Sequence, residues 1–284
     1  MSSALAASVI DFLHAAPRFE PRDELRLYLD GRPLGWIRPA VAAALLELAG
    51  ADAVQEAQAL RLRLGEDLQT RSQRLQAMAA ALRDRGLLRN WRDEDMALMQ
   101  DDKPWLVMER AAFRTFGLRT PSVHMNGWVA LPEGVALWVA RRSPHKFVDP
   151  GRLDNLVGGG LSAGESLATG LAREAWEEAG LRFRRVPRPV STLLVHRRIE
   201  EGVQDEMIAV HDCWLPRHWQ PCNQDGEVAD VTLMPLPEAL PLLLAGRFTW
   251  DAGLVVIDGL LRQRHFGAAG ADIEATLGAL GHRP

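Results

Sequence analysis

Residues 159–181 read GGLSAGESLATGLAREAWEEAGL, and this stretch indicates both the fold and the chemistry that we expect. If its second half is a helix of about 3.6 residues per turn, then Glu174, Glu177 and Glu178 stand at positions i, i+3 and i+4 and share one face. Carboxylates that close repel each other and destabilise a helix unless a cation neutralises them. Clustered carboxylate oxygens suit a hard divalent ion, above all Mg²⁺ when phosphate oxygens complete its shell.

The neighbouring residues support this geometry. Arg173 lies four residues before Glu177 and can brace the acidic face, and Glu165 in the preceding loop is another partner for Arg173. The glycine run 158–160 lets the backbone approach a ligand closely, and Gly180 suits a left-handed helix stop. The alternative is a solvated acidic helix face, which a lone Glu-Glu pair would leave favoured. The complete pattern G-x5-E-x7-R-E-U-x-E-E-x-G-U favours a functional site.

At these residues the chain resembles the Nudix hydrolases and matches every position of their signature box. The resemblance implies an α+β fold, an α/β/α sandwich with a mixed sheet, that hydrolyses a diphosphate linked to another moiety. It implies Mg²⁺ as the metal, with Mn²⁺ as an alternative. By matching position, Glu174, Glu177 and Glu178 are expected to ligate the metal, with one acting as base, and the carbonyl of Gly158 to join the shell. Arg173 and Glu165 are expected to orient the carboxylates. The family often draws a further acidic ligand from outside the box, and spacing does not identify it here.

Composition agrees with a soluble enzyme. The chain has 284 residues, 47% of them hydrophobic and 25% charged, and its net charge of −4 offers no basic field for nucleic acid. Cys213 and Cys222 are too few for a disulfide framework or a zinc ribbon, and we expect two reduced thiols. The first residues lack a basic leader, and no apolar run is long enough to span a membrane. We therefore expect a cytoplasmic protein that binds neither membrane nor nucleic acid.

The chain is long enough for two domains. We expect a smaller α+β domain of uncertain role at residues 1–118 and the Nudix domain at residues 119–284. Turn residues and hydrophobic periodicity predict a hairpin at 25–37, helices at 39–49, 72–85, 236–245 and 252–263, and strands at 123–131, 135–141, 193–198 and 207–215. Trp91, Arg92 and Trp105 are placed in the connection between the two domains, where tryptophans more often pack than bind ligands.

Shorter segments extend the resemblance beyond the box. They are ERAAFR at 109–114, VHMNGW at 123–128, LWVARRS at 137–143, LDNLVGGG at 153–160, DGEV at 225–228 and VVID at 255–258. Together they look like one Nudix subgroup, related to the Nudix half of fungal thiamine pyrophosphokinase fusions and to plant Nudix proteins that hydrolyse damaged thiamine diphosphates. In that subgroup a domain of poorly known function precedes the Nudix fold.

The subgroup resemblance points to thiamine diphosphate or its oxidised analogues as substrate, cleaved to the monophosphate and phosphate. Lys146 and Arg142, with His145, are candidates to hold the terminal phosphate, and Lys146 ranks first because it leads into the glycine loop. Gly159 and Gly160 can bring backbone to the substrate. Analogues with an uncharged ring should be preferred if the enzyme spares the intact coenzyme, since rejecting a thiazolium cation needs only a site without a compensating anion. Four tryptophans are available as ring faces: Trp128, Trp138, Trp214 and Trp250.

Other functions stay open at this point. A nucleotide or another nucleoside-diphosphate derivative is the main alternative substrate. NADH pyrophosphatases of the superfamily carry four zinc-binding cysteines, and dinucleoside polyphosphate hydrolases often stack bases on tyrosine, whereas this chain has two cysteines and a single tyrosine, Tyr28. A diphosphate isomerase needs a catalytic cysteine in a recognisable context. A regulator that binds its ligand without cleaving it usually has lost residues of the box, whereas the box of this chain is intact. The partner is expected to be a small-molecule diphosphate, and a homodimer is possible.

Overall fold

A central mixed sheet organises the second half of the chain. The computed structural model describes residues 3–284. The sheet order is β11-β12-β7-β8-β13, with β10 paired to β7 and β9 to β8. β12 runs parallel to β7, and the other pairs are antiparallel. The strands are β7 (Arg119–Leu131), β8 (Gly134–Arg142), β9 (Leu153–Asp154), β10 (Val157–Gly160), β11 (Ser191–Ile199), β12 (Gly202–Trp214) and β13 (Val228–Pro235).

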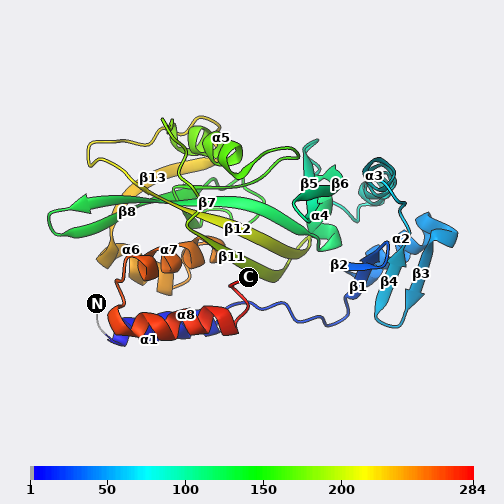
Figure 1. Cartoon of the computed structure of the whole chain (residues 1–284), viewed down its shortest axis with the longest axis horizontal. Coiled ribbons are helices and arrows are strands. Elements are labelled where there is room, and N and C mark those ends of the chain that lie inside the picture. Colours follow the sequence, from blue (N-terminus) through cyan, green and yellow to red (C-terminus); the bar gives the residue numbers. More distant parts are fainter. Residues whose placement is uncertain (1–2) are drawn as a thin grey trace.

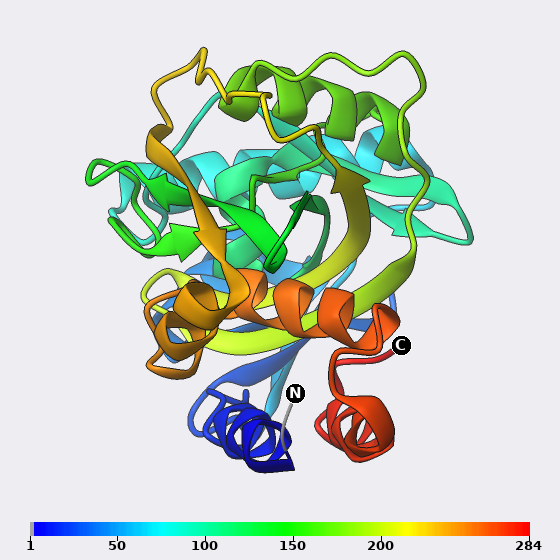
Figure 2. The ribbon, with the colours of Figure 1, turned by 90° about the vertical axis from the view of Figure 1, so that its left-hand side faces the viewer.

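Helices cover both faces of this sheet. In Figure 1, α5 (Leu167–Ala179) lies above the sheet and α6 (Leu236–Leu244) with α7 (Trp250–Arg262) below it. Figure 2 shows α1 (Ser3–His14) and α8 (Gly270–Ala279) side by side beneath α7. The short turn η2 (Gly267–Ala269) leads into α8. The predicted α/β/α sandwich with a mixed sheet is confirmed. Among residues 3–284, no helix combines the length and the apolar character that a bilayer span requires.

The alternation of strand side chains builds a separate core on each face. On β7, Trp128 packs with Leu254 and other residues of α7, whereas its neighbour Val129 packs with Leu171 of α5. Val9 of α1 joins the core on the α7 side. The helix that begins the chain therefore packs on the sandwich, although the smaller unit follows it in sequence. We call residues 119–284 with α1 the sandwich unit.

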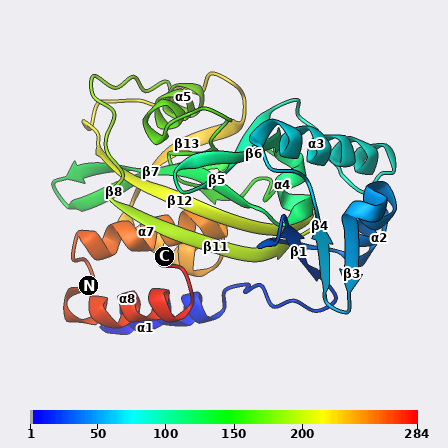
Figure 3. The same ribbon diagram turned by 45° about the vertical axis from the view of Figure 1, so that its right-hand side comes forward.

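Residues 25–116 form the smaller N-terminal unit, on the right of Figure 1 and turned forward in Figure 3. Its main sheet has the order β2-β1-β4-β3, and β5 and β6 form a separate hairpin. Its elements are β1 (Leu25–Leu29), β2 (Arg32–Ile37), α2 (Pro39–Ala49), η1 (Gly50–Asp52), β3 (Ala53–Glu56), β4 (Ala59–Leu62), α3 (Leu68–Asp84), β5 (Asp95–Gln100), β6 (Lys103–Glu109) and α4 (Arg110–Phe116). Our division of the chain at residue 118 stays a prediction about independent domains.

Elements with strong local signals are where we expected them. The predicted helix at 39–49 is α2, opened by Pro39. The predicted hairpin is β1-β2, and Asp30 and Gly31 adopt φ of 47° and 79° in its turn, as a primed turn requires. The third helix begins at Leu68 rather than 72, because the Asp67 side chain accepts a hydrogen bond from the Thr70 amide and caps it.

The connection between the units is more ordered than we predicted. Residues 95–116 form the β5-β6 hairpin and α4, so the placement of Trp105 in a connection is wrong. Trp105 lies on β6 and is buried in the core of the N-terminal unit. The short apolar runs on these strands carry a weak periodic signal, and the hairpin is stabilised by packing on α3 and α4.

The two units meet along one edge of the sandwich. Glu24, which is buried, pairs with the partly exposed Arg198 of β11 at 2.8 Å, and Arg38 donates to the Ile199 carbonyl at 2.8 Å. Helix α4 lies on β12 so closely that a Cβ on Gly202 would stand 2.2 Å from the backbone oxygen of Arg114. This contact of backbone on backbone sets the position of α4 relative to the sheet.

We predict that Gly202→Ala lowers the free energy of unfolding by about 1–3 kcal/mol, because backbone must move to admit the methyl group. Gly278→Ala is the matched control: its Cβ meets nothing within 4 Å, and it lies inside α8, where alanine favours a helix. Urea denaturation of the variants measures both effects. If the Gly202 variant and the parent have equal free energies of unfolding, the α4–β12 contact can rearrange without loss of stability, which would contradict the prediction.

Candidate active site

Helix α5 carries the acidic residues of the box. It begins after Ser166, whose side chain and that of Thr169 form a capping box. It ends at Gly180, with φ of 65° in the left-handed region, so the predicted stop is confirmed. The predicted face is present: Glu174 and Glu178 are turned inward and buried, while Glu177 is only partly covered.

Arg173 ties this face together. Its Nη1 donates to Glu174 at 2.8 Å and to Glu177 at 3.0 Å. Its Nε and Nη2 donate to the two carboxylate oxygens of Glu165 at 2.8 Å each, and Nη2 also donates to the Gly160 carbonyl at 3.1 Å. These hydrogen bonds lower the pKa of Glu165 and raise that of Arg173. One guanidinium thus connects the loop before α5, the glycine strand and two box carboxylates.

Glu174 and Glu178 are an electrostatically costly pair. They are 7% and 6% exposed. Burial raises the pKa of Glu178 well above its ordinary value, and the charge of Glu174 adds to the rise. Burial also raises the pKa of Glu174. The Gly158 amide donates to Glu178 at 2.8 Å and offsets only part of this cost. Like charges held in a buried place favour a cation beside them.

The glycines of β10 allow this packing. A Cβ on Gly159 would lie 2.0 Å from a carboxylate oxygen of Glu174, and one on Gly158 would lie 2.8 Å from the ring of His124. Only glycine lets the Glu174 carboxylate lie against the strand backbone. The run 158–160 therefore serves close approach to a side chain of the site.

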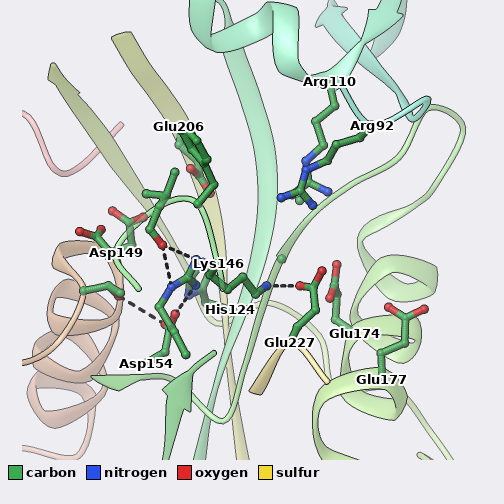
Figure 4. A pocket seen from close by; sticks show the side chains of 18 of the residues that line it. Arg92, Arg110, His124, Lys146, Asp149, Asp154, Glu174, Glu177, Glu206 and Glu227 are labelled. Atoms are coloured by element: carbon green, nitrogen blue, oxygen red, sulfur yellow. Dashed lines mark hydrogen bonds and ion pairs between the residues drawn. The ribbon is translucent and has the colours of Figure 1, made fainter. Parts of the chain in front are cut away.

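A cavity of about 330 Å³ opens beside these groups, between the sandwich unit and the N-terminal unit. Its walls carry nine Asp or Glu side chains and six Arg or Lys side chains. Figure 4 shows Glu174, Glu177 and Glu227 on one side, Arg92 and Arg110 above them, and Asp149 and Glu206 on the opposite side. The excess of carboxylates makes the cavity attractive to cations.

The structure brings most of the predicted residues to this cavity. Gly158, Gly159, Gly160, Arg142, Lys146, Arg173, Glu174 and Glu177 line it. Glu165 and Glu178 lie behind its wall, where they contact Arg173 and the Gly158 amide. His145 is not part of the lining.

The two predicted phosphate-binding cations are already paired. Arg142 donates to Asp154 at 2.8 Å and to the Val148 carbonyl at 2.9 Å, and Lys146 forms an ion pair with Glu227. These pairs lower the charge that Arg142 and Lys146 can offer to a phosphate.

Sequence reasoning missed several lining residues. Arg92 had been placed in a connection, and Arg110 only within the ERAAFR segment, yet both reach the cavity with Arg114. Glu227, from the DGEV segment, is an acidic residue beside the box, of the kind that spacing could not identify. The segment resemblance had marked residues 109–114 and 225–228, but no residue pattern showed that these segments meet.

The four tryptophans do not line the cavity, so their proposed use as ring faces is wrong for this pocket. Trp128, Trp138 and Trp250 pack in the cores, and Trp214 is 53% exposed on β12. Burying such large apolar side chains stabilises the fold, so they pack inside wherever helices cover a face of the sheet. The aromatic residue of the lining is Phe147, which is 43% exposed.

The residues present fit a hard divalent ion. Within the described part of the chain, no three Asp, Glu, His or Cys side chains already enclose an ion site, and Glu177 is hydrogen-bonded to Arg173. The donors at hand are nevertheless carboxylate and carbonyl oxygens, the ligands that Mg²⁺ prefers. Burial raises the pKa of both Glu174 and Glu178, so their ionised forms are costly and a cation beside them would offset that cost.

Comparison with known proteins agrees with the geometry. The chain is 36% identical over 167 residues to "Nudix hydrolase 24, chloroplastic" of Arabidopsis thaliana, covering 55% of this chain and 43% of the relative. It is 35% identical over 158 residues to "Nudix hydrolase 20, chloroplastic" of the same plant, covering 55% and 42%. The matched part thus spans less than half the length of these relatives.

Solved structures share lower similarity. The NUDIX domain of Shewanella oneidensis NrtR, complexed with ADP ribose, is 18% identical, with coverage of 55% of this chain and 99% of that one and a TM-score of 0.41. A protein of Deinococcus radiodurans, DR0079, is 22% identical, with coverage of 57% and 97% and a TM-score of 0.40.

Two family models match successive parts of the chain. Residues 9–120 match a domain of unknown function, DUF4743, and residues 123–253 match the NUDIX domain. The second match contains the box, the glycine strand and most of the central sheet. The second half of this chain is therefore a Nudix domain, and a DUF4743 domain precedes it.

Proposed function

We propose that this protein is a Mg²⁺-dependent hydrolase that cleaves the diphosphate of a small molecule, with thiamine diphosphate or an oxidised analogue as its substrate. The observation that carries the hydrolase proposal is the pair Glu174 and Glu177, held by Arg173 at a cavity rich in carboxylates, with Glu178 buried behind the wall against the Gly158 amide. Mn²⁺ is an alternative metal with the same oxygen preference. The similarity to two proteins named Nudix hydrolases supports the reaction class.

The acidic side of the cavity would hold the metal. Glu174, Glu178 and Glu177 would supply carboxylates and Gly158 its carbonyl, with Glu227 as the acidic group from outside the box. When bound there, Mg²⁺ supplies the Lewis acidity that shields phosphate oxygens and makes water a better nucleophile. Its charge would also relieve the repulsion between the buried carboxylates, so metal binding and local stability are coupled.

The protein's own residues provide positioning. Arg173 holds Glu174 and Glu177 in fixed rotamers and pins Glu165 to the glycine strand, so the carboxylates are arranged before substrate arrives. Glycines at 158–160 let the Glu174 carboxylate and the Arg110 guanidinium lie against the strand backbone beside the cavity. Glu177, more accessible than Glu174 and Glu178, is best placed to take the proton of the attacking water. Water then adds across the phosphoanhydride bond, giving a monophosphate and phosphate.

The wall opposite the metal-binding carboxylates indicates which organic group of the substrate the cavity would bind. Asp149, Glu206 and Asp251 line it, and Gln204 donates to Glu206 at 2.6 Å and to Asp251 at 3.0 Å. Asp149 is paired with Arg197 at 3.0 Å, and the acceptors of Glu206 and Asp251 suit a ligand with N–H donors, such as the amino group of an aminopyrimidine ring. Phe147 offers an exposed aromatic face nearby.

This wall changes one expectation from the sequence. Preference for an uncharged ring depended on a pocket without an anion, and that condition is not met, because carboxylates line the cavity. The wall instead supports a substrate with a cationic or donor-rich ring. The amino group of adenine meets the same requirement, so a nucleotide derivative is the alternative substrate.

We predict that Glu178→Gln lowers kcat by about 10²-fold or more, roughly 2.7 kcal/mol of barrier, because the amide keeps the shape but removes a ligand charge. The folded protein should persist and should lose its stabilisation by added Mg²⁺, measured as Tm against Mg²⁺ concentration. Glu238→Gln, an exposed change on α6, is the control. Near-parental rates at saturating Mg²⁺ would remove Glu178 from the proposed ligand set.

Arg173→Ala should reduce activity and raise the Mg²⁺ concentration needed for half-maximal rate, because Glu165, Glu174 and Glu177 lose their common donor. Arg184→Ala, on the exposed loop after α5, is the control. Initial rates against Mg²⁺ concentration distinguish the two. An unchanged metal requirement in the Arg173 variant contradicts its positioning role.

Substrate choice is tested by kcat/KM values for thiamine diphosphate, oxythiamine diphosphate, ADP-ribose and a nucleoside triphosphate. We expect thiamine diphosphate to exceed oxythiamine diphosphate by about tenfold or more, about 1.4 kcal/mol, because an oxo group in place of the amino group leaves buried acceptors unpaired. If a nucleotide is preferred by tenfold, the thiamine proposal fails and the hydrolase proposal stands.

A further inference from the structure

The N-terminal unit contributes to the cavity one arginine, Arg92, that differs from the cations of the sandwich unit. Arg142, Lys146 and Arg173 of the sandwich unit are each bound to carboxylates within hydrogen-bonding distance. Arg92 forms no side-chain hydrogen bond or ion pair with any residue in the range 3–284, although it lines the cavity. Arg110, also of the N-terminal unit, stands next to it in Figure 4.

Arg110 is fixed directly above the glycine strand. Its Nη1 donates to both oxygens of Glu94, at 2.9 and 3.2 Å, and the Ser162 hydroxyl donates to Glu94 at 2.9 Å. A Cβ on Gly160 would lie 3.1 Å from Nη2 of Arg110. The free edge of this guanidinium is therefore held beside the backbone of the box, where a diphosphate would lie.

The position of the hairpin strengthens this arrangement. The Ala163 amide donates to the Asp95 carbonyl at 2.7 Å, which joins β5 to the loop before α5. Arg92 precedes this strand, and Arg110 follows the hairpin. Both arginines line the same cavity as Glu227 and Glu174. They are therefore close to the acidic side of the cavity.

Two guanidinium groups that converge on one cavity repel each other unless an anion lies between them. Glu94 compensates Arg110, and no protein carboxylate compensates Arg92 by direct contact among the described residues. Guanidinium groups bind phosphate through paired, planar N–H donors. The alternative is that Arg92 is only a solvated surface charge. Arg110 would then serve only to hold Glu94, which accepts a hydrogen bond from Ser162 of the sandwich unit.

We propose that Arg92 and Arg110 form a phosphate subsite, through which the N-terminal unit binds the terminal phosphate of the substrate opposite the metal-binding carboxylates. The role of this unit is then to complete the active site and to favour substrates that end in a phosphate over those whose diphosphate is esterified at both ends. This inference rests on the proposed function for the identity of the substrate, but the subsite itself can be tested without turnover.

The first experiment measures binding. Methylenediphosphonate, a diphosphate mimic that cannot be hydrolysed at its bridge, is titrated with Mg²⁺ into the full-length protein by calorimetry. Arg92→Gln should weaken binding about tenfold or more, about 1.4 kcal/mol, and Arg92→Lys should retain part of the affinity. Arg110→Lys keeps the charge but loses the fork, and should also weaken binding. Arg89→Gln, a change at an exposed arginine that pairs with Glu200 at 3.8 Å and does not line the cavity, is the control.

The second experiment measures selectivity. The ratio of kcat/KM for thiamine diphosphate or ADP to that for ADP-ribose should fall about tenfold in Arg92→Gln and stay unchanged in Arg89→Gln. Arg92 makes no side-chain hydrogen bond or ion pair within residues 3–284 that its removal would break, so a loss of selectivity there points to the ligand.

The outcomes separate the two proposals. Binding by the Arg92 and Arg110 variants within twofold of the parent, no binding by the parent itself, or an equal loss in Arg89→Gln overturns the subsite. If binding depends on Arg92 and Arg110 while no diphosphate is hydrolysed, the subsite stands and the proposed hydrolase function fails.

Discussion

The whole site depends on the hydrogen bonds of one guanidinium. Arg173 joins Glu165, Glu174, Glu177 and the Gly160 carbonyl, each at 3.1 Å or less. Without it, the carboxylates of α5 would repel each other toward solvent, and the loop before the helix would lose its tie to the glycine strand. Because its donors are fully used inside the protein, Arg173 arranges the other groups and leaves contact with the substrate to them.

This arrangement buries two carboxylates, Glu174 and Glu178, whose negative charges destabilise the fold but suit a metal ion. Burial raises the pKa values of both Glu174 and Glu178, which means that keeping them ionised opposes folding. The rest of the sandwich offsets this cost through two apolar cores, one on each face of the sheet. A site whose anions are held in place before a cation arrives needs little rearrangement when it binds, and this preorganisation favours catalysis.

The second unit gives the cavity its other wall. Backbone contact between Gly202 and α4, together with the ion pair of Glu24 and Arg198, fixes that wall relative to the central sheet. The division of labour follows from charge: the sandwich unit provides the carboxylates of the box, and the N-terminal unit provides Arg92 and Arg110. Binding a diphosphate together with a divalent cation requires negative groups for the metal and positive groups for the phosphate oxygens.

The sequence by itself determined the features that depend on neighbouring residues: the acidic face of α5, its stop at Gly180, the turn at Asp30-Gly31 and helix α2. Each follows from contacts within about one helical turn or one tight turn. Only the tertiary structure decided that Arg92 and Glu227 share a cavity and that Trp128 is core rather than ligand platform. Residues so distant in sequence meet only after two units and both faces of a sheet have packed, and no local pattern encodes that meeting.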